Sequence, residues 1–486
     1  MVRSLQIKSI LLITLISLYS CQTDIRNKAV VTNEQPPIYS DIDSIVIPRN
    51  IAPLNIMPSI DILSDCEGVF VEILDPDNMR IIESEGEKST KINLEEWRSL
   101  LKKANRLQIT IYINKKQPTQ KEPVWERYRP LTVFVSNVEI EPWVAYRKIA
   151  PGYEVYGKMG IYQRSLETGS EHIILENSKT HNGCLNCHCF SNHSGATFSL
   201  HLRGGSNPGT FIKRNGTDRF ANVPKEELGG SFVYPSWHCD GRHIAYSVNK
   251  TQQMFHTKSH KRIEVVDHWS KIVVFDTETE KYTTNTILSS DSVFVTFPSF
   301  SPDGNWLYYC KAKAVDIASE SQNVRYALCR TPFDAQSNTI GSEEEILFDA
   351  PSRGLSATFP RVSPDGDFVA FCLCRYGQFS IWHPESDIAI LDLNKGTIRV
   401  DNNINSSDTE SYHSWSHDGK WMIFSTRRAN GLFTQPYIAH FDLTTGSFSK
   451  PFLMPIERIE DYNDEFYSYN VPEFVSDKIT SQDICF

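Results

Sequence analysis

The sequence predicts an all-β protein with two folded parts, a β-sandwich over residues 40–176 followed by a β-propeller over residues 195–486. Two patterns support this prediction. Runs of alternating apolar and polar residues occupy the first part, and one aromatic-rich motif with an Asp-Gly pair recurs four times in the second. The chain of 486 residues is 40% hydrophobic and 22% charged, which is typical of a globular protein with more than one core.

The first twenty residues have the features of a secretory signal. Arg3 and Lys8 precede an apolar run over residues 10–18, which is too short to cross a bilayer as a stop-transfer helix. The run ends in Leu18-Tyr19-Ser20-Cys21, which resembles a bacterial lipobox and implies cleavage before a lipidated Cys21. Because Gln22 follows, the resemblance implies a chain anchored to the outer membrane and facing the periplasm. The alternative is an ordinary cleaved signal that leaves a free Cys21.

Residues 21–39 are polar, contain proline and lack a hydrophobic period, and we expect a flexible stalk there. The sandwich domain follows, with alternating runs at residues 68–74, 107–113 and 131–135. These predict strands of an immunoglobulin-like sandwich with a spacing or docking role. One amphipathic helix interrupts them, capped at Asn93, with apolar residues on adjoining faces at Leu94, Trp97, Leu100 and Leu101.

The repeated motif predicts the blades of the propeller. Its copies occupy residues 234–247, 297–310, 359–372 and 412–425, and their Asp-Gly pairs begin at Asp240, Asp303, Asp365 and Asp418. Asp-Gly accommodates the positive φ angles of a hairpin turn, and the flanking aromatic and branched residues favour strands. Residues 195–213 are interpreted as a degenerate first blade, and the tail from Pro451 as part of a sixth. We therefore expect five or six blades, with six preferred.

The second and third copies, Phe297-Pro-Ser-Phe-Ser-Pro-Asp-Gly and Phe359-Pro-Arg-Val-Ser-Pro-Asp-Gly, resemble the repeats of the TolB-like propeller family. The resemblance covers residues 195–486. It implies radially arranged sheets around a central channel and a docking role in the cell envelope, and it implies no chemistry by itself. The repeated aspartates, glycines and aromatic residues have structural roles in turns and core, so we assign them no catalytic role.

The segment Cys184-Leu185-Asn186-Cys187-His188 matches the pattern that attaches c-type haem. In this interpretation Cys184 and Cys187 form thioethers and His188 is the proximal iron ligand. Candidates for the distal ligand are His193, Met254, His256 and His260. The motif falls in a predicted connector, residues 177–194, so a haem there must be covered by the sandwich, the propeller or a partner. The chain also resembles cell-envelope lipoproteins that combine a propeller with this motif, which implies haem without naming a reaction.

Two other interpretations of the cysteine cluster stay open. A structural zinc ion could use Cys184, Cys187, Cys189 and His193 as its four ligands. A disulfide between Cys184 and Cys187, or one involving Cys189, could instead staple a surface loop in an oxidising compartment.

The remaining observations limit the function. The formal net charge of −10 argues against a nucleic-acid partner. No nucleophile elbow, His-Glu-x-x-His helix or phosphate-binding glycine loop occurs, which argues against a hydrolase. Two polar segments, residues 382–387 and Arg427-Arg428, either line a propeller face that binds a ligand or merely cap the sheet.

The sequence therefore predicts a lipid-anchored periplasmic protein with covalent haem c, working in electron transfer or in redox-linked docking to an envelope partner. The alternative is a non-catalytic propeller scaffold whose Cys/His cluster is structural, held by zinc or by a disulfide. A haem enzyme that acts on a small substrate is a third interpretation.

Overall fold

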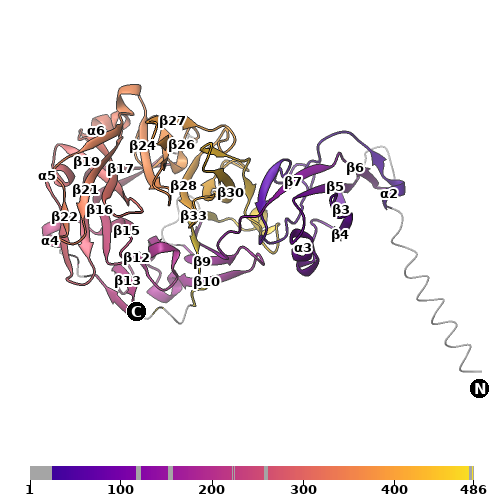
Figure 1. The fold of residues 1–486 in the computed structure, drawn as a ribbon, viewed down its shortest axis with the longest axis horizontal. Helices are drawn as coiled ribbons and strands as arrows, with labels where there is room; N and C mark the ends of the chain where they lie inside the picture. Colours follow the sequence, from indigo (N-terminus) through magenta and orange to yellow (C-terminus); the bar gives the residue numbers. More distant parts are fainter. Residues whose placement is uncertain are drawn as a thin grey trace, which may run out of the picture. The chain divides into compact units, whose positions relative to one another are not determined.

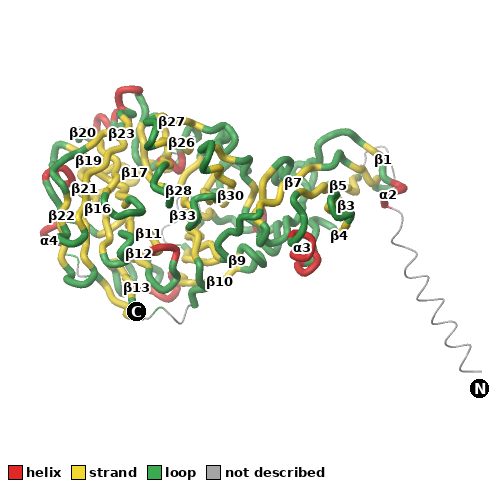
Figure 2. The backbone as a smooth tube through the Cα atoms, viewed as in Figure 1, coloured by secondary structure: helices red, strands yellow, loops and turns green. Residues whose placement is uncertain are grey.

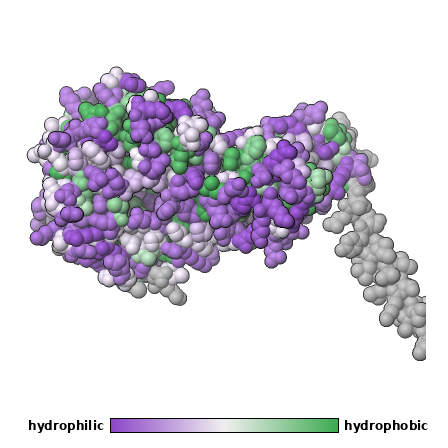
Figure 3. All heavy atoms as spheres, in the orientation of Figure 1, coloured by the Kyte–Doolittle hydropathy of each residue, from purple (hydrophilic) through white to green (hydrophobic). Residues whose placement is uncertain are grey.

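The computed structural model of the chain describes residues 25–116, 122–150, 157–221, 223, 225–256, 261–480 and 484, which form two compact units. The predicted signal peptide and the lipidation site Cys21 lie outside the described residues. Strands dominate, and the helices are short (Figure 2). Hydrophilic residues cover most of the visible surface, with apolar residues in small groups (Figure 3). Among the described residues, no helix is long and apolar enough to cross a membrane.

The first unit, made by described residues within 25–44, 53–135 and 458–460, contains one mixed β-sheet and two helices, α2 (Ile25–Lys28) and α3 (Leu94–Leu101). Its strands lie in the order β1 (Val30–Val31), β6 (Val124–Arg127), β5 (Arg106–Lys115), β3 (Cys66–Asp75) and β4 (Arg80–Gly86), and β7 (Leu131–Ser136) also pairs with β5. Alternate residues along β3 and β5 are buried, among them Val69, Val71, Leu107 and Ile109. One face of the sheet is therefore covered.

Helix α3 (Leu94–Leu101) confirms the predicted helix and its cap. The Asn93 side chain accepts hydrogen bonds from the backbone amides of Glu95 and Glu96 at 3.0 and 3.1 Å. The helix buries Trp97, Leu100 and Leu101. The prediction of a β-sandwich, which has two sheets, is wrong, because the described strands of this unit belong to one sheet. Sequence alternation reveals one buried face, but it does not say whether a second sheet or a helix covers that face.

The prediction of a flexible stalk is wrong for the residues from Ile25 onward. Helix α2 (Ile25–Lys28) and strand β1 belong to the first unit. Arg26 forms ion pairs with Glu72 and Glu83, and β1 pairs in parallel with β6. Two consecutive valines are enough to add an edge strand, which a prediction from average polarity does not detect.

The second unit contains six sheets arranged radially around an axis (Figure 1). In hydrogen-bonding order, and with the innermost strand first, the first three are β33 (Ser468–Val475), β8 (Trp143–Ile149), β9 (Met159–Ser165), β10 (Glu171–Glu176); β11 (Cys184–Phe190), β12 (Phe198–Arg203), β13 (Gly209–Arg214), β14 (Thr217–Phe220); and β15 (Phe232–Trp237), β16 (His243–Phe255), β17 (Ile263–Asp276), β18 (Lys281–Thr283). We call these blades 1, 2 and 3.

Blades 4, 5 and 6 follow the same plan. Their strands are β19 (Val293–Phe300), β20 (Trp306–Lys313), β21 (Ala327–Asp334), β22 (Thr339–Ile340), with β23 (Glu345–Phe348); β24 (Ser356–Val362), β25 (Phe368–Cys374), β26 (Asp387–Asp392), β27 (Thr397–Val400); and β28 (Glu410–Trp415), β29 (Trp421–Thr426), β30 (Gln435–Asp442), β31 (Ser447–Phe448), with β32 (Phe452–Leu453). Outside the blades lie β2 (Ile45–Pro48) and the short helices α4 (Lys225–Leu228), α5 (Thr286–Ser289), α6 (Ile317–Glu320) and α7 (Asp461–Asp464).

The ring of blades closes through the C-terminal strand. Strand β33 pairs with β8, so blade 1 takes its innermost strand from the far end of the chain. The innermost strands contact one another in a cycle, β33 to β11, β15, β19, β24, β28 and back to β33. The propeller and its preferred count of six blades are thus confirmed, as is the contribution of the tail.

Two predicted boundaries are corrected. Strands β8 to β10, within the predicted sandwich domain 40–176, belong to blade 1 of the propeller. The predicted connector 177–194 contains β11, which is the innermost strand of blade 2. Both errors have the same cause. The innermost strands of blades 1 and 2 lack the Tyr or Phe with which the motif begins, and the Asp-Gly turn by which the other blades were recognised does not follow them.

Candidate functional site

One residue in each innermost strand has a positive φ angle, and these residues occupy equivalent places around the axis. They are Cys187, Tyr234, Phe297, Phe359, Tyr412 and Val471, with φ between 49° and 54°. Each lies at an irregularity where the strand changes register against its neighbour. We call these six residues the axial ring. The Phe297 ring lies 4.0 Å from the Phe359 ring and 4.6 Å from the Tyr234 ring, so aromatic side chains pack together within it.

The haem-attachment motif is part of this repeating backbone. Cys187 occupies the axial position that the four recognised repeats fill with Tyr or Phe. His188 occupies the next position, which is proline in four of the six innermost strands and histidine again at His413. The segment Cys184–His188 is therefore a blade strand whose side chains differ from those of the other blades.

His188 is enclosed, and the Val471 backbone is a polar group that acts on its ring. It is 2% exposed, its ring lies against Phe190 at 5.9 Å, and neither ring nitrogen has a hydrogen-bond partner among the described residues. Burial lowers the pKa of His188 to about 4, against an opposing effect of the Val471 backbone. The imidazole is consequently neutral at pH 7.

The three cysteines of the motif region have different surroundings. Cys184 lines a cavity and accepts a hydrogen bond from Arg147 Nη2 at 3.5 Å. Cys187 is buried in the axial ring, and burial raises the pKa of its thiol. Cys189 packs against the core of blade 3 beside Trp237, and burial raises the pKa of its thiol as well. All three are free thiols in this structure.

The predicted zinc ligands are not brought together. Among the described residues, no group of three ligand atoms within 4.8 Å of one another includes Cys184, Cys187, Cys189 or His193. Instead, His193 Nδ1 lies 3.1 Å from the Phe474 carbonyl oxygen.

The motif residues do not fit a haem in the conformation seen here. An iron ion bound by His188 needs an accessible ring nitrogen with open space beside it, and both nitrogens are buried. The cavity next to Cys184 is lined neither by Cys187 nor by His188. Of the predicted distal ligands, Met254 packs against an apolar cluster and His256 is exposed. His260 lies outside the described residues.

The cavity beside Cys184 has a volume of about 280 Å³ and lies where the innermost strands begin. We call it the mouth cavity. Arginines from three blades line it, namely Arg147 on β8, Arg203 on β12 and Arg427 just after β29, and no described aspartate or glutamate does so. Tyr234 and Tyr412 of the axial ring also line it, so it opens onto the axis of the propeller.

The three guanidinium groups have no ion-pair partner among the described residues. Arg147 donates to Asn186 Oδ1 at 3.2 Å and to Cys184 Sγ, and its Nε is buried without a partner. Arg427 is 3% exposed, donates to the Ile381 carbonyl oxygen at 2.8 Å and stacks on Trp382 at 3.3 Å. Burial lowers the pKa of Arg427 to about 9, so it keeps its charge at neutral pH.

The predicted ligand-binding segments contribute only in part. Trp382 and Arg427 line the mouth cavity, but His383 is fully buried, with its Nε2 2.9 Å from Glu264 Oε1. Arg428 lies 3.0 Å from the carboxylate of Glu410. The sequence did not indicate Arg147 or Arg203, because each comes from a strand without the repeat signature.

Comparison with known proteins gives little beyond these observations. No family model matches the chain, and no curated protein matches it. Among solved structures, the chain is similar to an oligogalacturonate lyase from Vibrio parahaemolyticus, with a TM-score of 0.36 and 14% identity over 60% of this chain and 70% of that one. It is also similar to a puromycin-hydrolysing peptidase from Mycobacterium tuberculosis, with a TM-score of 0.36 and 9% identity over 73% of this chain and 52% of that one.

Proposed function

We propose that this chain is a non-catalytic propeller protein that binds a small anionic ligand in the mouth cavity. One observation carries the proposal: three guanidinium groups line a cavity of about 280 Å³ and none has an ion-pair partner among the described residues. Guanidinium groups bind carboxylates and phosphates through paired, charge-assisted hydrogen bonds. The volume is close to the lower end of small-molecule sites, roughly 300 Å³.

The surroundings of the arginines support an anion rather than a neutral ligand. The chain as a whole has a formal net charge of −10, and yet described acidic residues are absent from the lining of this cavity. Partly enclosed walls strengthen the attraction of fixed charges for a ligand of opposite charge. Trp382, Tyr234 and Tyr412 add flat apolar surface for the body of the ligand.

In this proposal the Cys/His cluster is structural. Cys187 and His188 fill the axial and adjacent positions of a blade strand, and Cys184 contributes to the cavity wall. The signal and lipobox-like sequence at Cys21 support export and lipid attachment, with the propeller facing the periplasm from the outer membrane. In that setting the ligand is a small anion or an acidic group on an envelope partner.

Covalent haem c with electron transfer is the second candidate. Two observations favour it, namely the complete Cys-x-x-Cys-His pattern and the buried His188 ring, whose nitrogens have no hydrogen-bond partner among the described residues. It requires blade 2 to change its conformation around His188, because both ring nitrogens are buried. It therefore predicts a blade 2 whose conformation differs from the one described here.

Calorimetric titration of the mature chain with succinate, citrate and inorganic phosphate tests the anion site. At least one of these anions should bind, and succinamide, the neutral analogue of succinate, should not. Arg203→Gln should weaken anion binding about tenfold, because it removes a charge-assisted contact. Arg375→Gln is the matched control, since Arg375 is exposed and lies outside the cavity lining. No binding of any of the three anions, or equal binding by Arg203→Gln, would contradict the proposal.

A further inference from the structure

The hairpin turn of blade 3 differs from the equivalent turns of blades 4, 5 and 6 at three positions around its aspartate. The residue two before the aspartate is His238, where the other copies have Ser301, Ser363 and Ser416. The residue three after it is His243, where the others have Trp306, Phe368 and Trp421. The residue between His238 and the aspartate is Cys239, in place of Pro302, Pro364 and His417.

The turn itself does not require these changes. In the three sister turns the serine hydroxyl donates to the aspartate Oδ1 at 2.5 to 2.7 Å, and a backbone amide two residues after the aspartate donates to the same oxygen. A serine therefore suffices to hold an Asp-Gly turn in this propeller. The turn of blade 3 instead contains two imidazoles and a thiol, which are metal-ligating groups.

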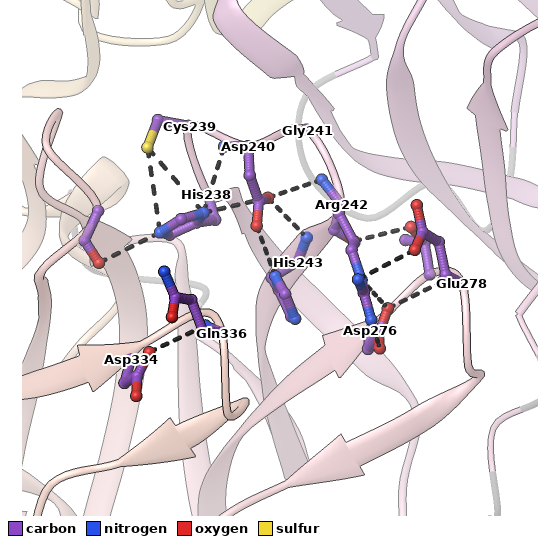
Figure 4. A network of polar contacts seen from close by, with 12 residues as sticks. His238, Cys239, Asp240, Gly241, Arg242, His243, Asp276, Glu278, Asp334 and Gln336 are labelled. Carbon is purple, nitrogen blue, oxygen red and sulfur yellow. Dashed lines mark hydrogen bonds and ion pairs between the residues drawn. The ribbon is translucent and has the colours of Figure 1, made fainter.

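The ligand-type atoms of His238, Asp240 and His243 lie within 4.8 Å of one another. His238 Nδ1 is 3.0 Å from Asp240 Oδ1, and His243 Nδ1 is 2.7 Å from Asp240 Oδ2 (Figure 4). In the figure the two rings approach the carboxylate from different sides, while Arg242 extends away from it toward Asp276 and Glu278. The guanidinium group of Arg242 thus forms ion pairs with Asp276 and Glu278 and not with Asp240.

The hydrogen bonds around His238 bring its Nδ1 close to the Asp240 carboxylate. Its Nε2 is 3.2 Å from the Gly304 carbonyl oxygen, which can only accept, so this partner assigns the proton of a neutral ring to Nε2. The lone pair of Nδ1 then accepts a hydrogen bond from the Asp240 backbone amide at 3.2 Å, and Nδ1 also lies 3.0 Å from Asp240 Oδ1. Two electron-rich atoms at that separation repel each other unless a proton or a metal ion lies near both.

His243 supplies the second imidazole of the cluster. It is 1% exposed, and its Nε2 has no hydrogen-bond partner among the described residues. The sister turns place a large aromatic ring at this position, and Trp421 Nε1 is likewise buried without a partner among the described residues. The nitrogen that serves the site is Nδ1, which lies 2.7 Å from Asp240 Oδ2 and is held there by the burial of the ring.

We propose that the turn of blade 3 binds a divalent transition-metal ion of the zinc type through His238, Asp240 and His243. Two imidazoles and one carboxylate form a donor set that zinc uses with water at the fourth position. The Asp240 side chain is 30% exposed, which gives solvent and the ion access to the site. The Cys239 thiol lies beside the His238 ring but not within 4.8 Å of all three ligand atoms, and it is not included. This site is separate from the mouth cavity, whose lining contains none of these residues.

The sister turns supply test variants that this backbone already tolerates. We would measure zinc bound per chain by equilibrium dialysis and elemental analysis, and the affinity by competition with a chelating dye. The wild-type chain should bind about one zinc ion at this site. His238→Ser and His243→Phe, which restore the residues of sister blades, should each weaken binding at least about tenfold. Their circular dichroism spectra should match that of the wild type.

Two controls locate the ion. His268→Ala removes an exposed histidine outside the turn and should leave zinc binding unchanged. The double variant Cys184→Ala with Cys187→Ala should also retain the ion, which separates this site from the cysteine motif. No zinc bound by the wild type, or unchanged zinc in folded His238→Ser and His243→Phe, would overturn the proposal.

Discussion

Strands β11 of blade 2 and β19 of blade 4 have the same backbone arrangement and different side-chain chemistry. Cys187 and Phe297 have φ angles of 50° and 54°, and both strands shift register at this point. In β19 the axial position holds a phenyl ring 4.0 Å from its neighbour, and a proline follows. In β11 it holds a small thiol followed by His188, whose ring nitrogens have no hydrogen-bond partner among the described residues. The closed ring of blades therefore determines the backbone conformation of its innermost strands. One strand can have different side chains and keep the same backbone conformation.

The largest difference between the two strands should appear on truncating the axial side chain. Phe297→Ala should lower the free energy of unfolding by about 3 to 5 kcal/mol, because it removes a buried ring from the axial ring. Cys187→Ala should lower it by no more than about 1 kcal/mol, because little volume is lost. Chemical denaturation measures both values. Equal losses would show that the thiol has a role beyond filling its position.

The next difference concerns the residue after the axial position. His188→Pro should raise the free energy of unfolding by about 1 kcal/mol, because it removes an unpaired buried imidazole and restricts the unfolded chain. Proline already occupies this position in Pro235, Pro298, Pro360 and Pro472. A large loss of stability in the same denaturation experiment would mean that His188 has a partner, such as a haem iron.

Acid should affect the two strands differently. The folded pKa of His188 is about 4, below its ordinary value of 6.5, so the unfolded state takes up the proton first as the pH falls. Stability should therefore be lost between pH 6.5 and 4, by up to about 1.4 kcal/mol per pH unit, and the loss should level off below that range. The measurement is the difference in unfolding free energy between the wild type and His188→Pro across this range. A difference that does not depend on pH would contradict the buried, neutral imidazole.

The smallest expected effect on stability lies at the mouth cavity. Arg203→Gln should change the free energy of unfolding by less than about 0.5 kcal/mol, because Arg203 is half-buried and has no ion pair among the described residues. The same variant should lose about tenfold in anion affinity, as described above. Denaturation alongside calorimetry separates the two effects. A large loss of stability would make Arg203 a structural residue instead.

Blades 3 to 6 were predictable because each keeps an aromatic residue, an Asp-Gly turn and a following apolar strand. Blade 2 was only partly recognised, because Cys187 and His188 replace the aromatic-Pro pair and the residues after Phe190 lack Asp-Gly. Blade 1 was assigned to the wrong domain because its innermost strand is 292 residues or more from β10 along the chain. The sequence signal that could have identified this strand is in residues 470–474, which keep the proline and the later aromatic residue of the motif as Pro472 and Phe474.

The candidate sites were less predictable than the fold. The arginines of the mouth cavity come from three blades, and no local pattern connects Arg147, Arg203 and Arg427 before the ring is closed. His238 and His243 were visible in the first repeat copy, but only comparison with the serine and aromatic residues of the sister copies marks them as unusual. The Cys-x-x-Cys-His pattern was detected at once, but its position on a blade strand was not, because motif spacing contains no information on burial.

The structure places Cys184–His188 in a blade strand, and we propose that this segment does not bind haem. The most direct test is to express the mature chain together with the cytochrome c maturation machinery and to record its pyridine haemochrome spectrum, beside the Cys184→Ala and Cys187→Ala double variant. The wild-type protein should be colourless and folded, with no covalent haem. A c-type spectrum that the double variant lacks would contradict the proposal and would show that blade 2 opens to take haem.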